Sequence, residues 1–203
     1  YDPKFKDAWK LGISLDEYSE EWKATSDEWR EKAAHCIEAM SEGHDPNAAD
    51  IKSVQKELVE VTQKFNAWVK ERSLYFLNNN KLVVGLGGDH STPLGLIDAL
   101  SEKHDSFAVL QIDAHCDLRN AYEGFEYSHA SIMYNVLKNK KVSKLVQVGI
   151  RDYCEEEVNY IENSKGRVKT FFDRNLKHAV YSGKSIKQIH QEIVEELPQK
   201  VFL

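Results

Sequence analysis

The sequence lacks the features that mark secreted or membrane-spanning proteins. Only three of its 203 residues are cysteines, and no two of them form a CxxC pair. An odd number of scattered cysteines argues against a disulfide framework and is typical of a reducing compartment, so we expect a cytoplasmic protein. No apolar run approaches the roughly 20 residues that a membrane-spanning helix needs, so we expect no membrane partner.

Basic clusters are also lacking. The chain has 27 Lys and Arg against 33 Asp and Glu, which gives a formal charge of −6. A mildly acidic surface repels phosphate backbones, so we expect no nucleic-acid partner. Apolar residues make up 41% of the chain and charged residues 30%, which is typical of a globular protein with a substantial core.

Residues 14–79 have the residue spacing of helices almost throughout. Ser14 and Glu17 predict a capping box, Gly43 a helix end, and Asp45 or Asn47 the cap of a second helix. An apolar stripe then recurs at spacings of three and four: Ile51, Val54, Leu58, Val61, Phe65 and Trp68. This stripe favours packing on the partner helix and the rest of the chain. An interface in a homo-oligomer is the alternative.

From Lys81 onward, short apolar runs alternate with helical patterns. The sequence predicts strands at 81–86, 107–113, 144–150, 167–172 and 200–203. It predicts helices at 92–103, 129–138, 153–163 and 185–196. This alternation indicates an α/β fold with a mainly parallel sheet covered on both faces. Ligands of such sheets bind beyond the carboxyl ends of the strands, which directs attention to the residues that follow each strand.

The stretch "LQIDAHCDLRN" ends an apolar strand with Asp113, His115 and Asp117 at alternate positions. If the backbone stays extended, these three side chains share one side, and Cys116 faces the other way. Two carboxylates and an imidazole form a mixed oxygen and nitrogen ligand set. Such a set suits manganese or a similar divalent ion, with no thiolate to favour zinc.

A histidine and a loop complete the candidate site. His90 follows the predicted strand 81–86 within "GLGGDHSTP", where Ser91 or Thr92 could cap the next helix. His90, Asp113, His115 and Asp117 together supply four ligands, too few for two six-coordinate ions. The loop from the metal strand to the next helix ends at His129, which could act as a general acid or proton shuttle. An ordinary surface histidine is the alternative.

The segments "GGDHS" (87–91), "DAHCD" (113–117) and "SHAS" (128–131) resemble the ureohydrolase (arginase/agmatinase) superfamily, in that order. "DLRNAYEGFEYSHAS" and "QVGIRDY" are most similar to the bacterial agmatinase branch. The resemblance implies a three-layer α/β/α sandwich and two Mn²⁺ ions. His90 and Asp117 would bind one ion, His115 the other, and Asp113 both. It further implies that a metal-bridging hydroxide attacks a guanidinium carbon, that His129 shuttles the proton, and that urea and an amine are released.

The same resemblance implies a small cationic guanidino substrate, with agmatine hydrolysed to putrescine and urea as the leading hypothesis. Arginases carry an asparagine two positions beyond the last aspartate of "DAHCD", where this chain has Arg119. Arginase, guanidinobutyrase and formimidoylglutamase stay open, as does a non-catalytic metal-binding or oligomeric scaffold.

Two departures from the superfamily shape the expected domain organisation. Residues 14–79 form a longer helical stretch than is typical, which predicts a helical hairpin insertion beside a core at 81–203. The second metal motif, Asp-x-Asp after a later strand, is absent. We therefore expect residues 1–203 to be one incomplete α/β domain, with its first strand, its C-terminal part and some metal ligands outside this chain.

Overall fold

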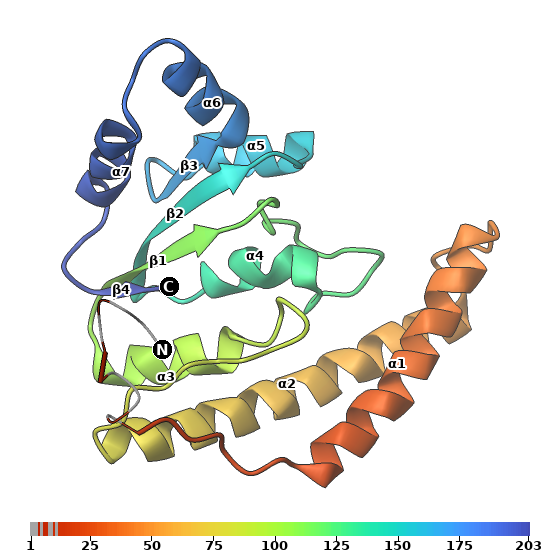
Figure 1. The fold of residues 1–203 in the computed structure, drawn as a ribbon. Coiled ribbons are helices and arrows are strands. Elements are labelled where there is room, and N and C mark those ends of the chain that lie inside the picture. The colour runs from red at the N-terminus through yellow and green to blue at the C-terminus, as the bar shows by residue number, and fades with distance from the viewer. Residues whose placement is uncertain (1–3, 5, 8–9, 11) are drawn as a thin grey trace.

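The computed structural model describes residues 4, 6–7, 10 and 12–203 and is built around a parallel four-stranded sheet (Figure 1). The strand order is β3-β2-β1-β4. The strands are β1 (Phe107–Ile112), β2 (Val142–Ile150), β3 (Val168–Phe172) and β4 (Val201–Phe202). Four of the five predicted strands are thus present and parallel.

Helices cover both faces of the sheet. One face packs on α3 (Leu94–Lys103), α4 (Ile132–Val136) and α5 (Glu155–Asn163), and the other on α6 (Asp173–Tyr181) and α7 (Ile186–Glu195). Successive strand residues serve opposite faces, as the pleat requires. In β2, Leu145 belongs to the core of the first face and Val146 to the core of the second. The predicted three-layer α/β/α fold is confirmed.

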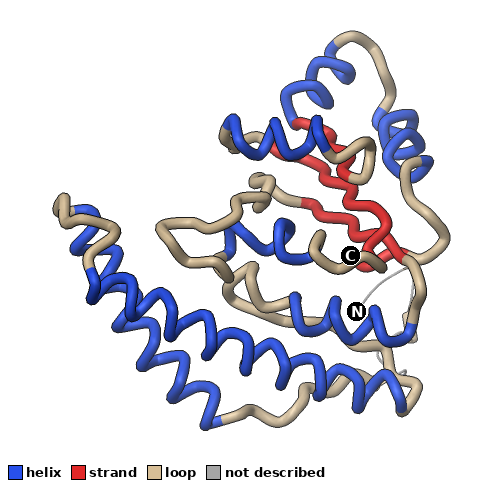
Figure 2. The backbone as a smooth tube through the Cα atoms, turned by 180° about the vertical axis from the view of Figure 1, so that it is seen from behind, coloured by secondary structure: helices blue, strands red, loops and turns tan. Residues whose placement is uncertain are grey.

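A long helical hairpin lies outside α3. It consists of α1 (Glu20–Ser41) and α2 (Ala49–Asn78), which run antiparallel (Figures 1 and 2). The predicted apolar stripe of α2 packs within the chain: Ile51 is buried with Cys36, while Trp22 of α1 contacts the rings of Phe65 and Trp68. Packing on the partner helix is therefore confirmed. That the hairpin is an insertion into a longer domain stays a prediction.

Gly43 ends the first helix as predicted, since it follows the C-cap residue Glu42 with a φ of 93°. The predicted N-caps of the two helices are wrong. The first helix begins at Glu20, and its N-cap is Ser19, whose Oγ accepts the backbone N–H of Trp22 at 3.2 Å. Residues 14–19 are not helical, because the Asp16 carboxylate accepts two hydrogen bonds from Arg72 of α2. Ala48, not Asp45 or Asn47, stands at the N-cap of α2.

The predicted strand at 81–86 is also wrong. Its residues form an irregular segment, and no backbone hydrogen bond joins residues 82–86 to another described segment. Both sides of β1 are occupied by β2 and β4, and residues 81–86 pair with neither of the edge strands β3 and β4. Its alternate apolar side chains Leu82, Val84 and Leu86 are left 92%, 79% and 87% exposed.

Further differences concern helix ends. Helix α3 begins at Leu94 with Pro93 at its N-cap, so neither Ser91 nor Thr92 caps it. The predicted helix 129–138 is a short 3₁₀ turn, η2 (His129–Ser131), followed by α4. Helix α6 has no counterpart in the sequence prediction. No helix in the described part of the chain is long and apolar enough to cross a membrane.

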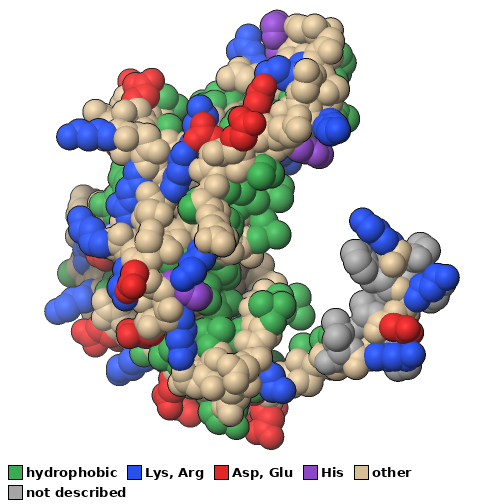
Figure 3. Space-filling model, turned by 90° about the vertical axis from the view of Figure 1, so that its left-hand side faces the viewer, with side chains coloured by type: hydrophobic (Ala, Val, Ile, Leu, Met, Phe, Trp, Pro, Cys, Tyr) green, Lys and Arg blue, Asp and Glu red, His purple; other side chains and the backbone are tan. Residues whose placement is uncertain are grey.

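Exposed apolar side chains are present on the side of the molecule that carries α7 and β4. Figure 3 views the side that lies on the left in Figure 1, where α7 and β4 are found, and shows hydrophobic side chains on its surface. The exposed apolar residues of these elements include Ile186, Val194 and Val201.

Helices α2 and α3 cross closely at Gly95. A Cβ atom at this position would lie 2.5 Å from the carbonyl oxygen of Asn66 and 2.7 Å from Cβ of Val69. Both atoms belong to the interior of α2 and cannot move without shifting the helix. Helices α2 and α3 therefore pack this closely because residue 95 has no side chain.

We predict that Gly95→Ala lowers the free energy of unfolding by about 1–3 kcal/mol, because the added methyl group overpacks the helix crossing. Gly88→Ala is the matched control, since a Cβ there meets nothing within 4 Å and φ is not positive. Urea unfolding followed by circular dichroism measures both. Equal stability of the two variants would contradict the close crossing.

Candidate metal centre

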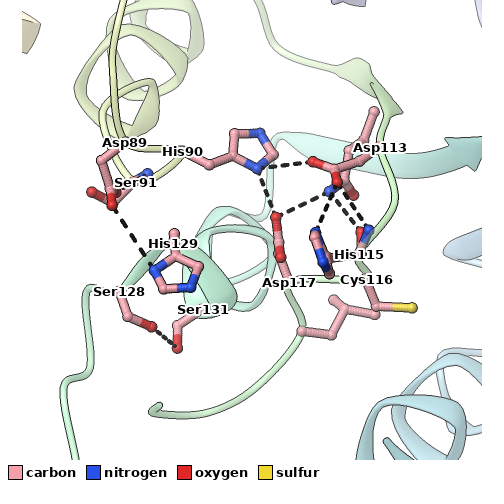
Figure 4. A network of polar contacts seen from close by, with 12 residues as sticks. Asp89, His90, Ser91, Asp113, His115, Cys116, Asp117, Ser128, His129 and Ser131 are labelled. Carbon is pink, nitrogen blue, oxygen red and sulfur yellow. Dashed lines mark hydrogen bonds and ion pairs between the residues drawn. The ribbon is translucent and has the colours of Figure 1, made fainter. Parts of the chain in front are cut away.

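The candidate ligands meet at the carboxyl end of β1 (Figure 4). Asp113 follows the last residue of the strand, Asp117 lies four residues further on, and His90 enters from the loop before α3. His90 Nδ1 lies 2.6 Å from Asp117 Oδ2 and 3.1 Å from Asp113 Oδ2. The sheet edge thus brings together three of the four predicted ligands.

The geometry of these three residues fits a divalent ion. One ligand atom from each of His90, Asp113 and Asp117 lies within 4.8 Å of the other two. Ligand atoms bound at about 2.1 Å from a common ion lie no more than about 4.2 Å apart, so small side-chain adjustments suffice. Two carboxylate oxygens and one imidazole nitrogen suit manganese, as the sequence predicted.

The electrostatics of the cluster favour a positive charge between the carboxylates. The hydrogen bond to Asp117 raises the pKa of His90 above its usual value, and partial burial opposes this only in part. Burial raises the pKa of Asp113, but the backbone N–H of His115 and the nearby His90 lower it further, so that the net shift is downward. The two carboxylates therefore favour positive charge at this point of the site.

His115 lies beside the cluster without belonging to it. Its Nδ1 is 3.3 Å from Asp113 Oδ1 and its Nε2 is 3.8 Å from Asp152 Oδ2, and the side chain is 59% exposed. The expectation that residues 113, 115 and 117 alternate along an extended backbone is wrong. The strand ends at Ile112, and Asp117 has a left-handed backbone with φ of 55°.

The turn at Asp117 is held from beneath by buried amides. The Gln111 side chain donates to the carbonyl oxygen of His115 at 3.1 Å and to Asp117 Oδ2 at 3.3 Å. Gln147 of β2 donates to Gln111 Oε1 at 2.6 Å and to the carbonyl oxygen of Cys116 at 2.7 Å. Both glutamines are buried, so their hydrogen bonds act in a low-dielectric interior and fix the turn firmly.

A buried carboxylate holds the far end of the same loop. Glu157 of α5 is 3% exposed. Its two oxygens accept the backbone N–H groups of Leu118 and Cys154, each at 2.9 Å. The carbonyl oxygen of Asp117 in turn accepts backbone N–H groups of Met133 and Tyr134 at the start of α4. Two helices therefore anchor the loop that carries the candidate ligands.

His129 stands at the rim of the site, at the start of η2. Its Nδ1 lies 3.9 Å from Asp89 Oδ2 (Figure 4). Its ring also makes an edge contact with the ring of Tyr122. The side chain is 57% exposed, so solvent reaches the imidazole. Ser128 occupies the N-cap position of η2, but its hydroxyl contacts the Ser131 hydroxyl rather than a backbone N–H.

Cys116 is excluded as a ligand, as predicted. It is fully buried in the core beneath the loop, and burial raises the pKa of its thiol to about 12.

The sequence analysis missed the residues that hold the metal loop in place. Gln111 and Gln147 carry a readable signal, since each is a polar residue within an apolar strand of a sheet covered on both faces. Glu157 stands among three successive glutamates, and nothing in that run singles it out.

Known proteins resemble this chain across the site. The model of the arginase family matches residues 20–203. The N(1)-aminopropylagmatine ureohydrolase of Thermus thermophilus is 45% identical over 83 residues, which cover 41% of this chain and 28% of that protein. The ureohydrolase of the same name from Synechocystis is 31% identical over 129 residues, covering 63% of this chain and 39% of that protein.

A solved structure supports the fold. The arginase of Medicago truncatula has a TM-score of 0.53 and 30% sequence identity, covering 64% of this chain and 40% of that one. The predicted arginase-like architecture is therefore confirmed. The chain spans well under half the length of the curated relatives named above.

We predict that Glu157→Gln, tested in the metal-free protein, lowers the free energy of unfolding by about 1–3 kcal/mol, because the new amide NH₂ cannot accept one of the two backbone N–H groups. The displaced loop should also weaken Mn²⁺ binding by roughly tenfold or more, as for other groups that orient ligands without touching the metal. Chemical unfolding and titration calorimetry provide the two readouts.

Glu156→Gln, an exposed change one residue away, is the matched control and should alter neither quantity. If both variants bind Mn²⁺ as the unchanged protein does, the Glu157 carboxylate does not position the metal loop.

Proposed function

This chain belongs to the arginase family, and on that premise we propose that the protein is a metal-dependent hydrolase that cleaves a C–N bond of a guanidino compound and releases urea. The observation that carries the proposal is the convergence of His90, Asp113 and Asp117 at the carboxyl end of β1, with His129 at the rim. A fold of this kind supports many activities, so the argument depends on the site and not on the architecture.

The proposed cofactor is a pair of Mn²⁺ ions. His90 and Asp117 would hold one ion and His115 the other, with Asp113 shared between them, as its contacts with both histidines favour. Bound divalent metal would supply Lewis acidity and make a water molecule a strong nucleophile at neutral pH. The second ion needs ligands beyond these four residues. Asp152, 3.8 Å from His115, is an acidic residue at the appropriate edge.

The protein's own side chains would hold the metal-site carboxylates in position and supply the proton that the departing amine needs. The carboxylates of Asp113 and Asp117 hold their positions through the buried amides and Glu157, so little reorganisation is needed when a cation binds. Cleavage of a guanidine C–N bond requires a proton on the departing amine nitrogen. His129 is an exposed imidazole at the rim of the site, with its Nδ1 3.9 Å from Asp89 Oδ2, and we assign it this proton transfer.

Agmatine, hydrolysed to putrescine and urea, is the substrate that we propose. The similarity of "DLRNAYEGFEYSHAS" to agmatinases supports it, as do the two relatives named as ureohydrolases of an aminopropyl derivative of agmatine. Arginine, 4-guanidinobutyrate and formimidoylglutamate are the alternatives. Three free cysteines suit the proposed cytoplasmic location, and assembly as a homo-oligomer is part of the same proposal.

The test of this function is urea release by the complete protein after manganese loading, with agmatine, arginine and 4-guanidinobutyrate side by side. We expect a preference for agmatine. Asp113→Asn should abolish turnover and weaken binding of both ions, because this carboxylate is shared between the two metal positions. No urea from any substrate, with two ions bound, would leave a binding role or an amidino substrate outside the panel.

His129→Ala should reduce turnover by about a hundredfold or more, the usual effect of removing a general acid, while metal content stays unchanged. Steady-state urea release and metal analysis measure the two quantities. His178→Ala, which removes an exposed histidine on α6, is the matched control. If the His129 variant loses its metal, the imidazole supports or binds the ions instead of shuttling protons.

A further inference from the structure

A cavity of about 200 Å³ lies beside the candidate metal centre. Asp89 and His129 line it on the side of the metal cluster. The loop from Tyr122 to His129 forms a second wall, and the α1–α2 hairpin forms the opposite wall. None of the functional roles assigned above involves the hairpin.

The hairpin wall is fixed against the loop by specific contacts. The buried side chain of Gln55 in α2 donates to the carbonyl oxygen of Glu123 at 3.0 Å. Gly124 has a φ of 81°, and a Cβ there would lie 2.0 Å from Gln55 Nε2, so only glycine fits on both counts. Phe125 is buried with Cys36 and Ile51 of the hairpin. The cavity is therefore a built feature and not a loose gap between two elements.

The two walls differ in chemistry. The hairpin contributes aliphatic side chains, among them Ile37, Leu58 and Val59, whereas the loop side contributes Glu123 and Glu126. Asp89 adds a third carboxylate, and no Lys or Arg is among the residues that line the cavity. An aliphatic chain with a positive charge at its far end would contact the apolar wall along its length and a carboxylate at its end.

We propose that this cavity takes the tail of the guanidino substrate and that the α1–α2 hairpin is the element that selects it. The tail would be aliphatic and would end in an ammonium group near Glu126, while the guanidinium lies at the metal cluster. The inference rests on the proposed function and deepens it, because it gives the hairpin a role in substrate choice.

Two variants test the proposal in the complete, manganese-loaded protein. Thr62→Trp fills the cavity from α2, and Ser53→Trp, on an exposed site of the same helix, is its control. Glu126→Gln removes the charge, and Glu60→Gln, exposed on α2 outside the cavity, is its control. The substrates are agmatine and butylguanidine, which share the guanidinium and the four-carbon chain but differ in the terminal amine.

Glu126→Gln should lower kcat/KM for agmatine relative to butylguanidine by roughly fivefold, the upper end for a solvent-exposed charge pair. Thr62→Trp should lower kcat/KM for both substrates, since the filled cavity excludes both tails. The two control variants should keep the values of the unchanged protein. An unaltered ratio in Glu126→Gln together with unaltered rates in Thr62→Trp would overturn the proposal.

A binding measurement separates this inference from the proposed activity. Butane-1,4-diamine serves as the probe, because it carries the chain and the ammonium group without a cleavable guanidinium. Titration calorimetry should show binding to the unchanged protein, weaker binding to Glu126→Gln and none to Thr62→Trp. If urea is released but neither variant changes diamine binding, the hydrolase activity stands and the substrate tail does not bind in this cavity. If the two variants weaken diamine binding but no substrate yields urea, the proposed hydrolase activity is wrong and the cavity is an amine-binding site.

Discussion

The left-handed turn at Asp117 is the constraint on which the site depends. A non-glycine residue with φ of 55° is strained, and it persists only where neighbouring groups fix it. Here buried amides hold the turn from below, and Glu157 holds its exit. This turn directs the Asp117 carboxylate back toward Asp113, so that two residues four positions apart can face one histidine. Without it, an extended backbone would carry the second carboxylate away from the cluster.

The supports of the turn also explain why the sheet and the site form one unit. Gln147 comes from β2 and accepts the Thr170 hydroxyl of β3, so the polar contacts run across three neighbouring strands. A polar chain of this length in an apolar core would be costly if any member lacked a partner. Each of its amides is hydrogen-bonded, and the core is therefore specified together with the metal loop.

The sequence predicted the parts of the molecule that depend on local pattern. Strands 107–113 and 144–150 are short, mainly apolar runs, and the structure contains both with ends shifted by one or two residues. It misplaced the start of α1 because Asp16 bonds to Arg72, a partner 56 residues away that no local pattern reveals. The sequence also predicted a strand at 81–86 that the structure lacks. Alternating apolar residues favour a strand, but the pattern does not show whether a neighbouring strand is there to pair with it.

The sequence likewise predicted some features of the candidate site and missed others. Residue types and order identified His90, Asp113, His115 and Asp117, and the structure gathers three of them because parallel strands end at a common edge. The position of His115 outside the cluster followed from the end of the strand at Ile112, which spacing alone does not reveal. The role of Glu157 in holding the metal loop was unpredictable, because its partner in that loop, the backbone N–H of Leu118, lies 39 residues away.

The unpaired segment 81–86 has a consequence for how this chain behaves among other molecules. Alternate apolar side chains beside unbonded backbone groups are the pattern that templates strand addition between chains. At high protein concentration, the 81–86 segments of two copies of the chain would thus tend to pair with each other. The same six residues that lead the chain toward His90 are therefore a point at which two copies could pair, and the tendency of the protein to aggregate depends on what covers them.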